Sequence, residues 1–163
     1  MASVHLRRTA SEDLDFVLGA EGDPENAGFI LPWTREQHAR ALADPDAAHR
    51  VIVQEGSYDP VGFVLLLGLT SPHGSLEFRR IVVTAKGRGI GRAAVRAVKH
   101  FAFEEHKAHR LWLDVKEFNA RARHLYASEG FLEEGILREC LRGESGFDSL
   151  VIMAMLASEY RQG

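Results

Sequence analysis

The alternation of apolar and polar positions predicts a chain that mixes strands with helices. Residues 4–8 alternate as a short strand, and the apolar runs 49–55 and 61–69 predict two strands joined by a turn at 56–60. The apolar pattern indicates four more strands farther along, at residues 76–83, 110–115, 131–137 and 146–156. Antiparallel hairpins therefore come first, and strands then alternate with helices.

Capping signals and three- and four-residue spacing predict four helices. Ser11 and the two acidic residues after it favour a helix to about residue 18, and residues 34–37 fit a capping box that opens a helix to about residue 43. Apolar residues predict a long helix at 92–106, and a shorter one is expected at 120–128. Residues 19–33 are expected to be irregular. We therefore predict an α+β fold in one domain spanning residues 1–163.

Composition limits the classes of function. The chain has 163 residues, 45% hydrophobic and 26% charged, which suits one domain with a substantial core. Its formal net charge of −3 argues against a protein that coats nucleic acid or anionic membranes. The single cysteine, Cys140, excludes an intrachain disulfide, and no apolar run is long enough to span a bilayer. The N-terminus lacks the apolar segment of a signal peptide, so we expect a cytoplasmic protein.

A glycine-rich loop at residues 86–91 leads from a predicted strand directly into a predicted helix. Backbone N–H groups at a helix N-terminus attract anions, and glycines let a phosphate approach the main chain. Lys86, Arg88 and Arg92 add positive charge there. The loop fits neither a Walker loop, because Arg92 and an alanine follow Gly91, nor the G-x-G-x-x-G spacing of a Rossmann loop. A tight connection with solvated basic side chains is the structural alternative.

Two segments resemble signatures of the GNAT (Gcn5-related) N-acetyltransferases. Residues 86–91 (KGRGIG) are similar to the acetyl-CoA motif Q/R-x-x-G-x-G/A, with Lys86 in place of the usual Gln or Arg. Residues 119–131 (NARARHLYASEGF) are similar to the second signature, N-x-x-A-x-x-L-Y-x-x-x-G-F. The resemblance covers about residues 61–157. It implies a single-domain GNAT fold, a mixed and mainly antiparallel sheet flanked by helices, with acetyl-CoA as co-substrate.

The last part of the chain is similar to the branches that acetylate ribosomal-protein alanine and spermidine. The resemblance therefore implies acetyl transfer to a primary amine in a ternary complex. The acceptor is either a small amine such as a polyamine or the N-terminus of a protein. A GNAT-like module that binds acyl-CoA as a sensor without turnover is the alternative, and the presence of Tyr126 and Asn119 argues against it.

The same resemblance assigns the acetyl-CoA site. Ile81 and Val83 would exchange main-chain hydrogen bonds with the pantetheine arm, and the N–H near Val82 would polarise the thioester carbonyl. Asn119 would contact the cofactor arm, cap its helix, or do both. The remaining expected acetyl-CoA contacts come from the loop and the start of its helix, namely Lys86, Gly87, Arg88, Gly89, Ile90, Gly91 and Arg92.

Three further residues are expected to take part in catalysis or acceptor binding. By resemblance Tyr126 protonates the departing CoA thiolate as a general acid, although an isolated helical tyrosine is more often a core residue. Glu77, on the strand before the glycine loop, would deprotonate the acceptor directly or through water, or would merely pair with a nearby cation. Trp33 would line the acceptor pocket or anchor the second helix.

Two expectations concern metals and assembly. The eight histidines have no metal-ligand spacing, so we expect no metal. The apolar segment Leu150-Val151-Ile152-Met153 suggests a strand edge that could form a homodimer.

Overall fold

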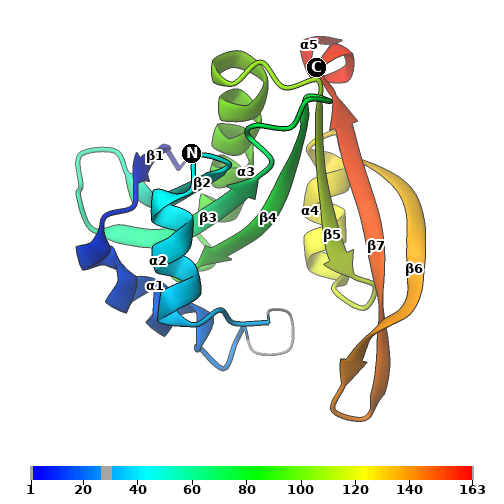
Figure 1. Cartoon of the computed structure of the whole chain (residues 1–163), viewed down its shortest axis with the longest axis horizontal. Coiled ribbons are helices and arrows are strands. Elements are labelled where there is room, and N and C mark those ends of the chain that lie inside the picture. Colours follow the sequence, from blue (N-terminus) through cyan, green and yellow to red (C-terminus); the bar gives the residue numbers. More distant parts are fainter. Residues whose placement is uncertain (1, 27–30, 163) are drawn as a thin grey trace.

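The seven strands form one sheet in the order β1-β2-β3-β4-β5-β7-β6 (Figure 1). The structure is a computed structural model that describes residues 2–26 and 31–162. All neighbouring strands are antiparallel except β4 and β5, which run parallel. The strands are β1 (Val4–Arg8), β2 (Ala47–Gln54), β3 (Pro60–Leu67), β4 (Ser75–Val83), β5 (Arg110–Lys116), β6 (Leu132–Gly143) and β7 (Gly146–Leu156).

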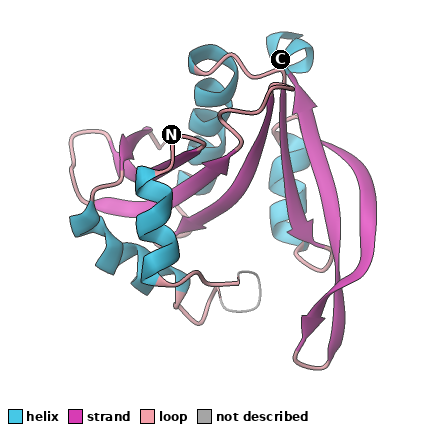
Figure 2. Cartoon of the chain, in the orientation of Figure 1, coloured by secondary structure: helices cyan, strands magenta, loops and turns pink. Residues whose placement is uncertain are grey.

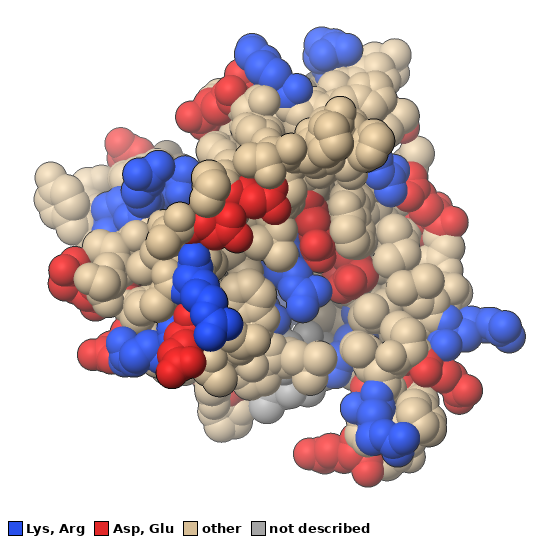
Figure 3. Space-filling model, in the orientation of Figure 1, with Lys and Arg blue, Asp and Glu red and all other residues tan. Residues whose placement is uncertain are grey.

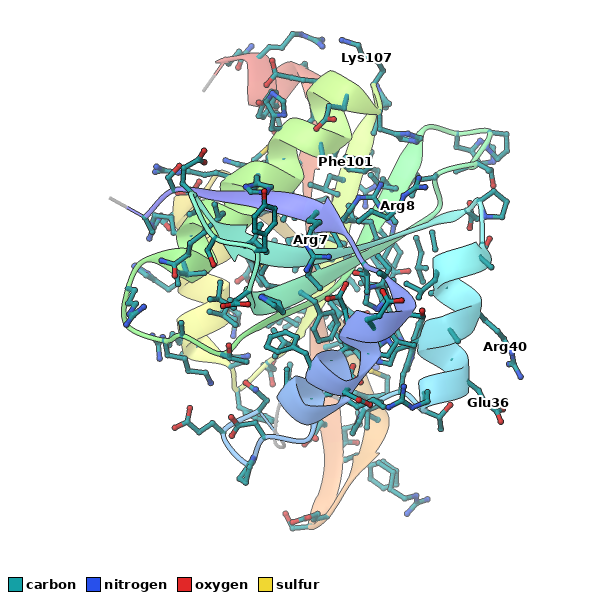
Figure 4. All side chains as sticks on the ribbon, turned by 90° about the vertical axis from the view of Figure 1, so that its left-hand side faces the viewer. Arg7, Arg8, Glu36, Arg40, Phe101 and Lys107 are labelled. Atoms are coloured by element: carbon teal, nitrogen blue, oxygen red, sulfur yellow. The ribbon has the colours of Figure 1, made fainter. Side chains whose placement is uncertain are left out.

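Helices cover both faces of the sheet (Figure 2). On β2, Val51 and Val53 pack in a core with Val17 of α1, whereas Ile52 belongs to a larger core with Val95 of α3. Successive strand residues point to opposite faces, so α1 and α3 lie on opposite sides of the sheet. Figure 4 shows α2 and α3 on either side of the strands, with Glu36 and Arg40 on the outer side of α2. The helices are α1 (Leu14–Glu21), α2 (Arg35–Ala43), α3 (Ile90–His100), α4 (Ala120–Ser128) and α5 (Ala157–Gln162).

All the predicted strands and helices are confirmed, and the differences lie at their ends. The predicted long helix consists of α3 followed by a π-helical turn, Phe101–Glu105. Helix α1 begins after a 3-10 turn at Ser11–Asp13 and extends to Glu21, into the segment expected to be irregular. Residues 27–30 of that segment lie outside the described residues. Thr34 caps α2 in a capping box with Gln37, as predicted. The sequence analysis missed α5.

Strand β4 separates from β5 after three residue pairs. Ser75, Leu76 and Glu77 pair with residues 110–112 of β5, and no later residue of β4 has a partner there. A bulge follows at once on the other side of β4, because Leu65 and Leu66 of β3 pair with Arg80 and Phe78 and leave Arg79 opposite no residue. The lower halves of β4 and β5 therefore diverge in Figure 1.

The proposed dimer edge at residues 150–153 is wrong. Strand β7 lies inside the sheet, with β5 on one side and β6 on the other. Its backbone hydrogen-bonding groups are already paired, so they are not available to a second chain. The edge strand at this end of the sheet is β6, whose residues are almost all exposed.

Charged side chains are interspersed on the face in Figure 3, consistent with 20 basic and 23 acidic residues. Among the described residues, no helix is both long and apolar enough to cross a membrane.

Glu129, just after α4, holds α3 through a buried carboxylate that is 4% exposed. It accepts hydrogen bonds from Arg92 (2.6 Å) and Arg96 (3.0 Å), and its backbone oxygen accepts from Lys99 (2.8 Å). Burial raises the pKa of Glu129, but the hydrogen bonds from these three cations outweigh burial and hold the pKa below its usual value.

We expect Glu129→Gln to lower the free energy of unfolding by ~1–3 kcal/mol at pH 7, because it leaves cations without their buried partner. A carboxylate whose pKa is lower in the folded than in the unfolded state stabilises the fold at pH values above its unfolded-state pKa. This stabilisation is lost as the pH falls through the folded-state pKa. The difference between wild type and variant, measured by urea unfolding, should therefore shrink below about pH 4.5. A difference that stays constant down to pH 3 would contradict this assignment. Arg96→Gln, which leaves Arg92 and Lys99 in place, should have a smaller effect.

Candidate active site

A cleft of about 1230 Å³ lies where β4 and β5 diverge. Its walls come from the divergent part of β4, the glycine-rich loop with the start of α3, the end of β5 and the start of α4. Leu141 of β6 and Leu150 of β7 add to the lining. Three residues of the α1–α2 connection, Glu25, Asn26 and Leu31, also line it. The cleft brings together most of the predicted site residues: Ile81, Val82, Val83, Lys86, Gly87, Gly89, Ile90, Gly91, Arg92, Asn119 and Tyr126.

The glycine-rich loop is held in a conformation that favours glycine. Gly87 has φ +78° and Gly89, the N-cap of α3, has φ +74°. A Cβ atom at either position would meet no other atom of the described chain within 4 Å. The backbone conformation, and not crowding, therefore demands glycine, and the main chain stays open to a ligand at the N-terminus of α3.

The cations around the loop differ in their surroundings. Lys86 donates to the Asn26 side chain (3.1 Å) and pairs with Glu25 (3.4 Å), so it fastens the α1–α2 connection to the loop. Arg92 lines the cleft, and its guanidinium donates a hydrogen bond to the carboxylate of Glu129 (2.6 Å). Arg88 is exposed and lies outside the cleft lining.

The divergent part of β4 presents main-chain groups to the cleft. The N–H of Thr84 donates to Val61 on β3 (2.8 Å), and Val82 pairs with Phe63 two residues earlier in the same register. Because peptide groups alternate in direction along an antiparallel pair, the N–H of Val82 also points toward β3. The main-chain groups of Ile81 and Val83 therefore face the cleft, as expected, while the N–H of Val82 itself does not.

Tyr126 lies at the junction of the cleft and the core, with 8% of its surface exposed. Its ring makes edge contacts with Phe78 (centroids 6.3 Å apart) and Phe131 (5.8 Å). Its carbonyl accepts from the N–H of Phe131 (3.0 Å), and Gly130, at φ +99°, ends α4 in a Schellman motif. Burial, with a smaller contribution from the charge of Asp114, raises the pKa of the Tyr126 hydroxyl, which stays protonated.

Asn119 caps α4, as expected, and its contact with the cofactor arm stays a prediction. Its side-chain oxygen accepts from the N–H of Ala122 (3.2 Å), which caps α4, and the residue also lines the cleft.

Asp114 is a cleft carboxylate that the sequence analysis missed. It lies on β5 between the buried residues Leu113 and Val115, so its side chain points away from the larger core and toward the cleft. Burial raises its pKa, and the charges of Arg79 and Arg80 oppose that rise. The alternation of residues 110–115 was the signal that could have identified it, since Asp114 is the acidic residue in an otherwise mainly apolar strand.

Glu77 and Trp33 lie outside the cleft lining. Glu77 is at the last position where β4 and β5 still pair, and its carboxylate lies 3.6 Å from Arg79. Trp33 packs against His38 of α2 (ring centroids 5.4 Å apart) and under the guanidinium of Arg80. This packing agrees with one of the two roles expected of Trp33, that of anchoring the second helix, α2.

Two of the scattered histidines meet in the interior. His38 and His49 are hydrogen-bonded (3.0 Å), and His38 also contacts the carboxylate of Glu21 (2.7 Å). In the part of the chain that the structure describes, no group of three or more His, Cys, Asp or Glu side chains is arranged to hold a metal ion.

Comparison with known proteins agrees with this geometry. The model of the acetyltransferase (GNAT) family matches residues 13–131. A spermidine N(1)-acetyltransferase from Vibrio cholerae serotype O1 is 29% identical over 116 residues, which cover 71% of this chain and 67% of that protein.

Solved structures support the fold. A spermidine N-acetyltransferase from Vibrio cholerae in complex with CoA and spermine superposes with a TM-score of 0.88, at 24% identity and over 98% of each chain. A dodecameric structure of spermidine N-acetyltransferase from the same organism has a TM-score of 0.82 at 24% identity, over 97% of this chain and 96% of that one. The predicted α+β fold is confirmed, whereas the assembly named for that relative differs from the expected homodimer.

We expect Gly89→Ala to weaken CoA binding at least about tenfold, because a left-handed alanine is strained by ~1–2 kcal/mol and relaxes by leaving the binding conformation. Isothermal titration with CoA measures the effect. Gly56→Ala is the matched control, since Gly56 has φ +79°, has equally open surroundings and lies in the β2–β3 turn. It should lose similar stability and keep its CoA affinity. Equal losses of affinity in both variants would refute a direct role for the loop.

Proposed function

The chain belongs to the acetyltransferase (GNAT) family, and we propose that this acetyltransferase moves the acetyl group of acetyl-CoA to a primary amine of a polyamine such as spermidine. We choose a cationic acceptor because the carboxylate of Asp114 lies half-buried in the cleft. The names of the similar proteins, which act on spermidine or bind spermine, support the same substrate class.

The glycine-rich loop and α3 form the donor side of the cleft. Phosphates of acetyl-CoA would accept from the backbone N–H groups of residues 87–91, and Lys86 and Arg92 would balance their charge. The pantetheine arm would form hydrogen bonds with the main-chain groups of Ile81 and Val83. It would thereby take the place of β5, which no longer pairs with β4 at these residues. The solved relative with bound CoA has the same fold, which agrees with this position for the donor.

The charges at the acceptor side favour an ammonium group. Arg79 pairs with Glu77 (3.6 Å), Arg80 with Glu21, and Lys116 with Asp148 (3.6 Å). Asp114 itself forms no ion pair with any residue of 2–26 or 31–162. An approaching amine therefore meets a carboxylate that has no ion pair, beside three cations that already have partners.

The reaction needs an acceptor that has lost a proton. An amine in water is mostly protonated, and Asp114 would hold the ammonium and accept its proton directly or through water. The free amine then attacks the thioester carbon, forming the C–N bond. When the C–S bond breaks, the thiolate takes the hydroxyl proton of Tyr126. The proton that the new amide nitrogen loses then returns to the Tyr126 oxygen, directly or through water. The hydroxyl of Tyr126 is protonated throughout the physiological range, so it has the proton that this step requires.

The decisive experiment combines calorimetry of acetyl-CoA binding with a free-thiol assay over a panel of amines. The panel contains spermidine, spermine, a monoamine, amino acids and short peptides. Thiol release that is fastest with the polyamines supports the proposal, and release with peptides alone would point to a protein N-terminus as acceptor. Binding without release under any condition would favour the sensor module.

We expect Tyr126→Phe to lower kcat by about 10²-fold, since general acid catalysis contributes 10²–10⁴-fold. The affinity for acetyl-CoA, measured by calorimetry, should stay within about twofold because the ring and its contacts remain. Unchanged turnover would remove Tyr126 from the acid role.

We expect Asp114→Asn to reduce kcat/KM for spermidine by about 10²-fold or more. In the wild type kcat/KM should fall as the pH drops through the raised pKa of Asp114, because the carboxylate must be ionised. The variant should lose this acidic limb of the profile. Glu77→Gln is the comparison that separates the two carboxylates. A greater loss in Glu77→Gln, with the acidic limb intact in Asp114→Asn, would return the role to Glu77.

A further inference from the structure

Glu21, the last residue of α1, is a buried carboxylate at the centre of a network beside the acceptor side of the cleft. Its side chain is 1% exposed and forms an ion pair with the guanidinium of Arg80 on β4. It also accepts from the ring of His38 on α2 (2.7 Å) and from the backbone N–H of Trp33 (3.2 Å). One carboxylate thus joins α1, α2, the segment before α2 and the bulged part of β4.

Arg80 transmits this arrangement to the cleft. It lines the cleft, and its second nitrogen donates to the backbone oxygen of Leu31 (2.7 Å), another lining residue. Its guanidinium lies over the ring of Trp33, 5.6 Å from the centroid. Glu21 therefore sets the position of Arg80, and Arg80 sets the position of the chain at Leu31.

The outer end of the network, at His49, carries no positive charge. His38 hydrogen-bonds to His49, and His49 to the hydroxyl of Thr9 (2.8 Å). Burial, together with the charge of His38, lowers the pKa of His49 to about 4, so that His49 is neutral at pH 7. Among the described residues, Glu21 is the carboxylate that forms an ion pair with Arg80.

That ion pair has a consequence for the acceptor. Arg80 is within electrostatic range of Asp114, the carboxylate assigned to the ammonium. An arginine stays protonated at any physiological pH, so without Glu21 it would repel a polycation at this point. The repulsion would grow with the number of charges on the amine.

We propose that Glu21 is a positioning residue that masks the charge of Arg80 and thereby allows acceptors with several positive charges to be used in preference to monoamines. This inference rests on the proposed function, since it concerns the acceptor side of the same cleft. It assigns to a residue of α1, away from the reacting atoms, part of the enzyme's selectivity.

The test measures kcat/KM for spermidine and for 1-aminobutane and takes their ratio. In Glu21→Gln the ratio should fall about tenfold, because one cation is unmasked against three substrate charges instead of one. Glu21→Asp keeps the charge and should keep the ratio. Arg80→Met should not lower the ratio, and the double variant E21Q/R80M should return it to the wild-type value. A network that served stability alone would affect both amines by the same factor in every variant.

Asp13→Asn is the matched structural control. Asp13 holds Arg7 through two hydrogen bonds (3.0 and 3.1 Å), and neither residue lines the cleft. This variant should lose stability in thermal unfolding while its ratio stays at the wild-type value.

Three outcomes would overturn the inference: an unchanged ratio in folded Glu21→Gln, a lower ratio in Arg80→Met, or a double variant that keeps the low ratio. If Glu21→Gln does not fold, Arg80→Met decides the question, because it leaves the Glu21 carboxylate without its cation. The ratio should then rise above the wild-type value, and an unchanged ratio would overturn the inference. A wild-type enzyme that binds acetyl-CoA but releases no thiol with either amine would instead contradict the proposed function.

Discussion

The separation of β4 from β5 is the constraint on which the rest of the molecule depends. A strand that loses its neighbour exposes N–H and C=O groups, and such groups must find other partners. Here they face a cleft of about 1230 Å³ instead of the core, so a bound molecule or water can satisfy them. The bulge at Arg79 accompanies this change, because it reverses which β4 side chains face each layer of helices.

Two buried carboxylates hold the walls of this opening. Glu129 binds the cations of α3 on the side of the glycine-rich loop, and Glu21 binds Arg80 on the opposite side. Each is buried only because it is hydrogen-bonded to positive groups, since a lone buried charge would be strongly unfavourable. Together they fix the helices relative to the sheet and neutralise cations that would otherwise dominate the cleft. The contrast between a neutralised Arg80 and an unpaired Asp114 follows from this arrangement.

The surroundings of the reacting groups suit opposite tasks. Tyr126 is buried among aromatic rings, and its hydroxyl therefore keeps its proton. Asp114 is half-buried near two arginines, so burial makes it a better base while the cations keep it from being neutralised entirely. A carboxylate and a protonated hydroxyl, the proposed base and acid, thus line one cleft, with the main chain of β4 beside them. This is the arrangement that transfer of an acyl group between sulfur and nitrogen requires.

The sequence by itself determined the elements, the glycine-rich loop, the cap at Asn119 and the position of Tyr126, because each depends on residues a few positions apart. Local spacing sets a cap, a left-handed glycine or the buried side of a helix. Only the tertiary structure brought Asp114 into the cleft, left Glu77 outside its lining, placed Trp33 against Arg80 and put β7 inside the sheet. These outcomes depend on strand order and on contacts between residues that are distant in the sequence. Glu21 and Arg80, for example, form an ion pair although they are 59 positions apart. No local pattern records which of several carboxylates will meet which cation, because burial and packing of the whole sheet select that pair.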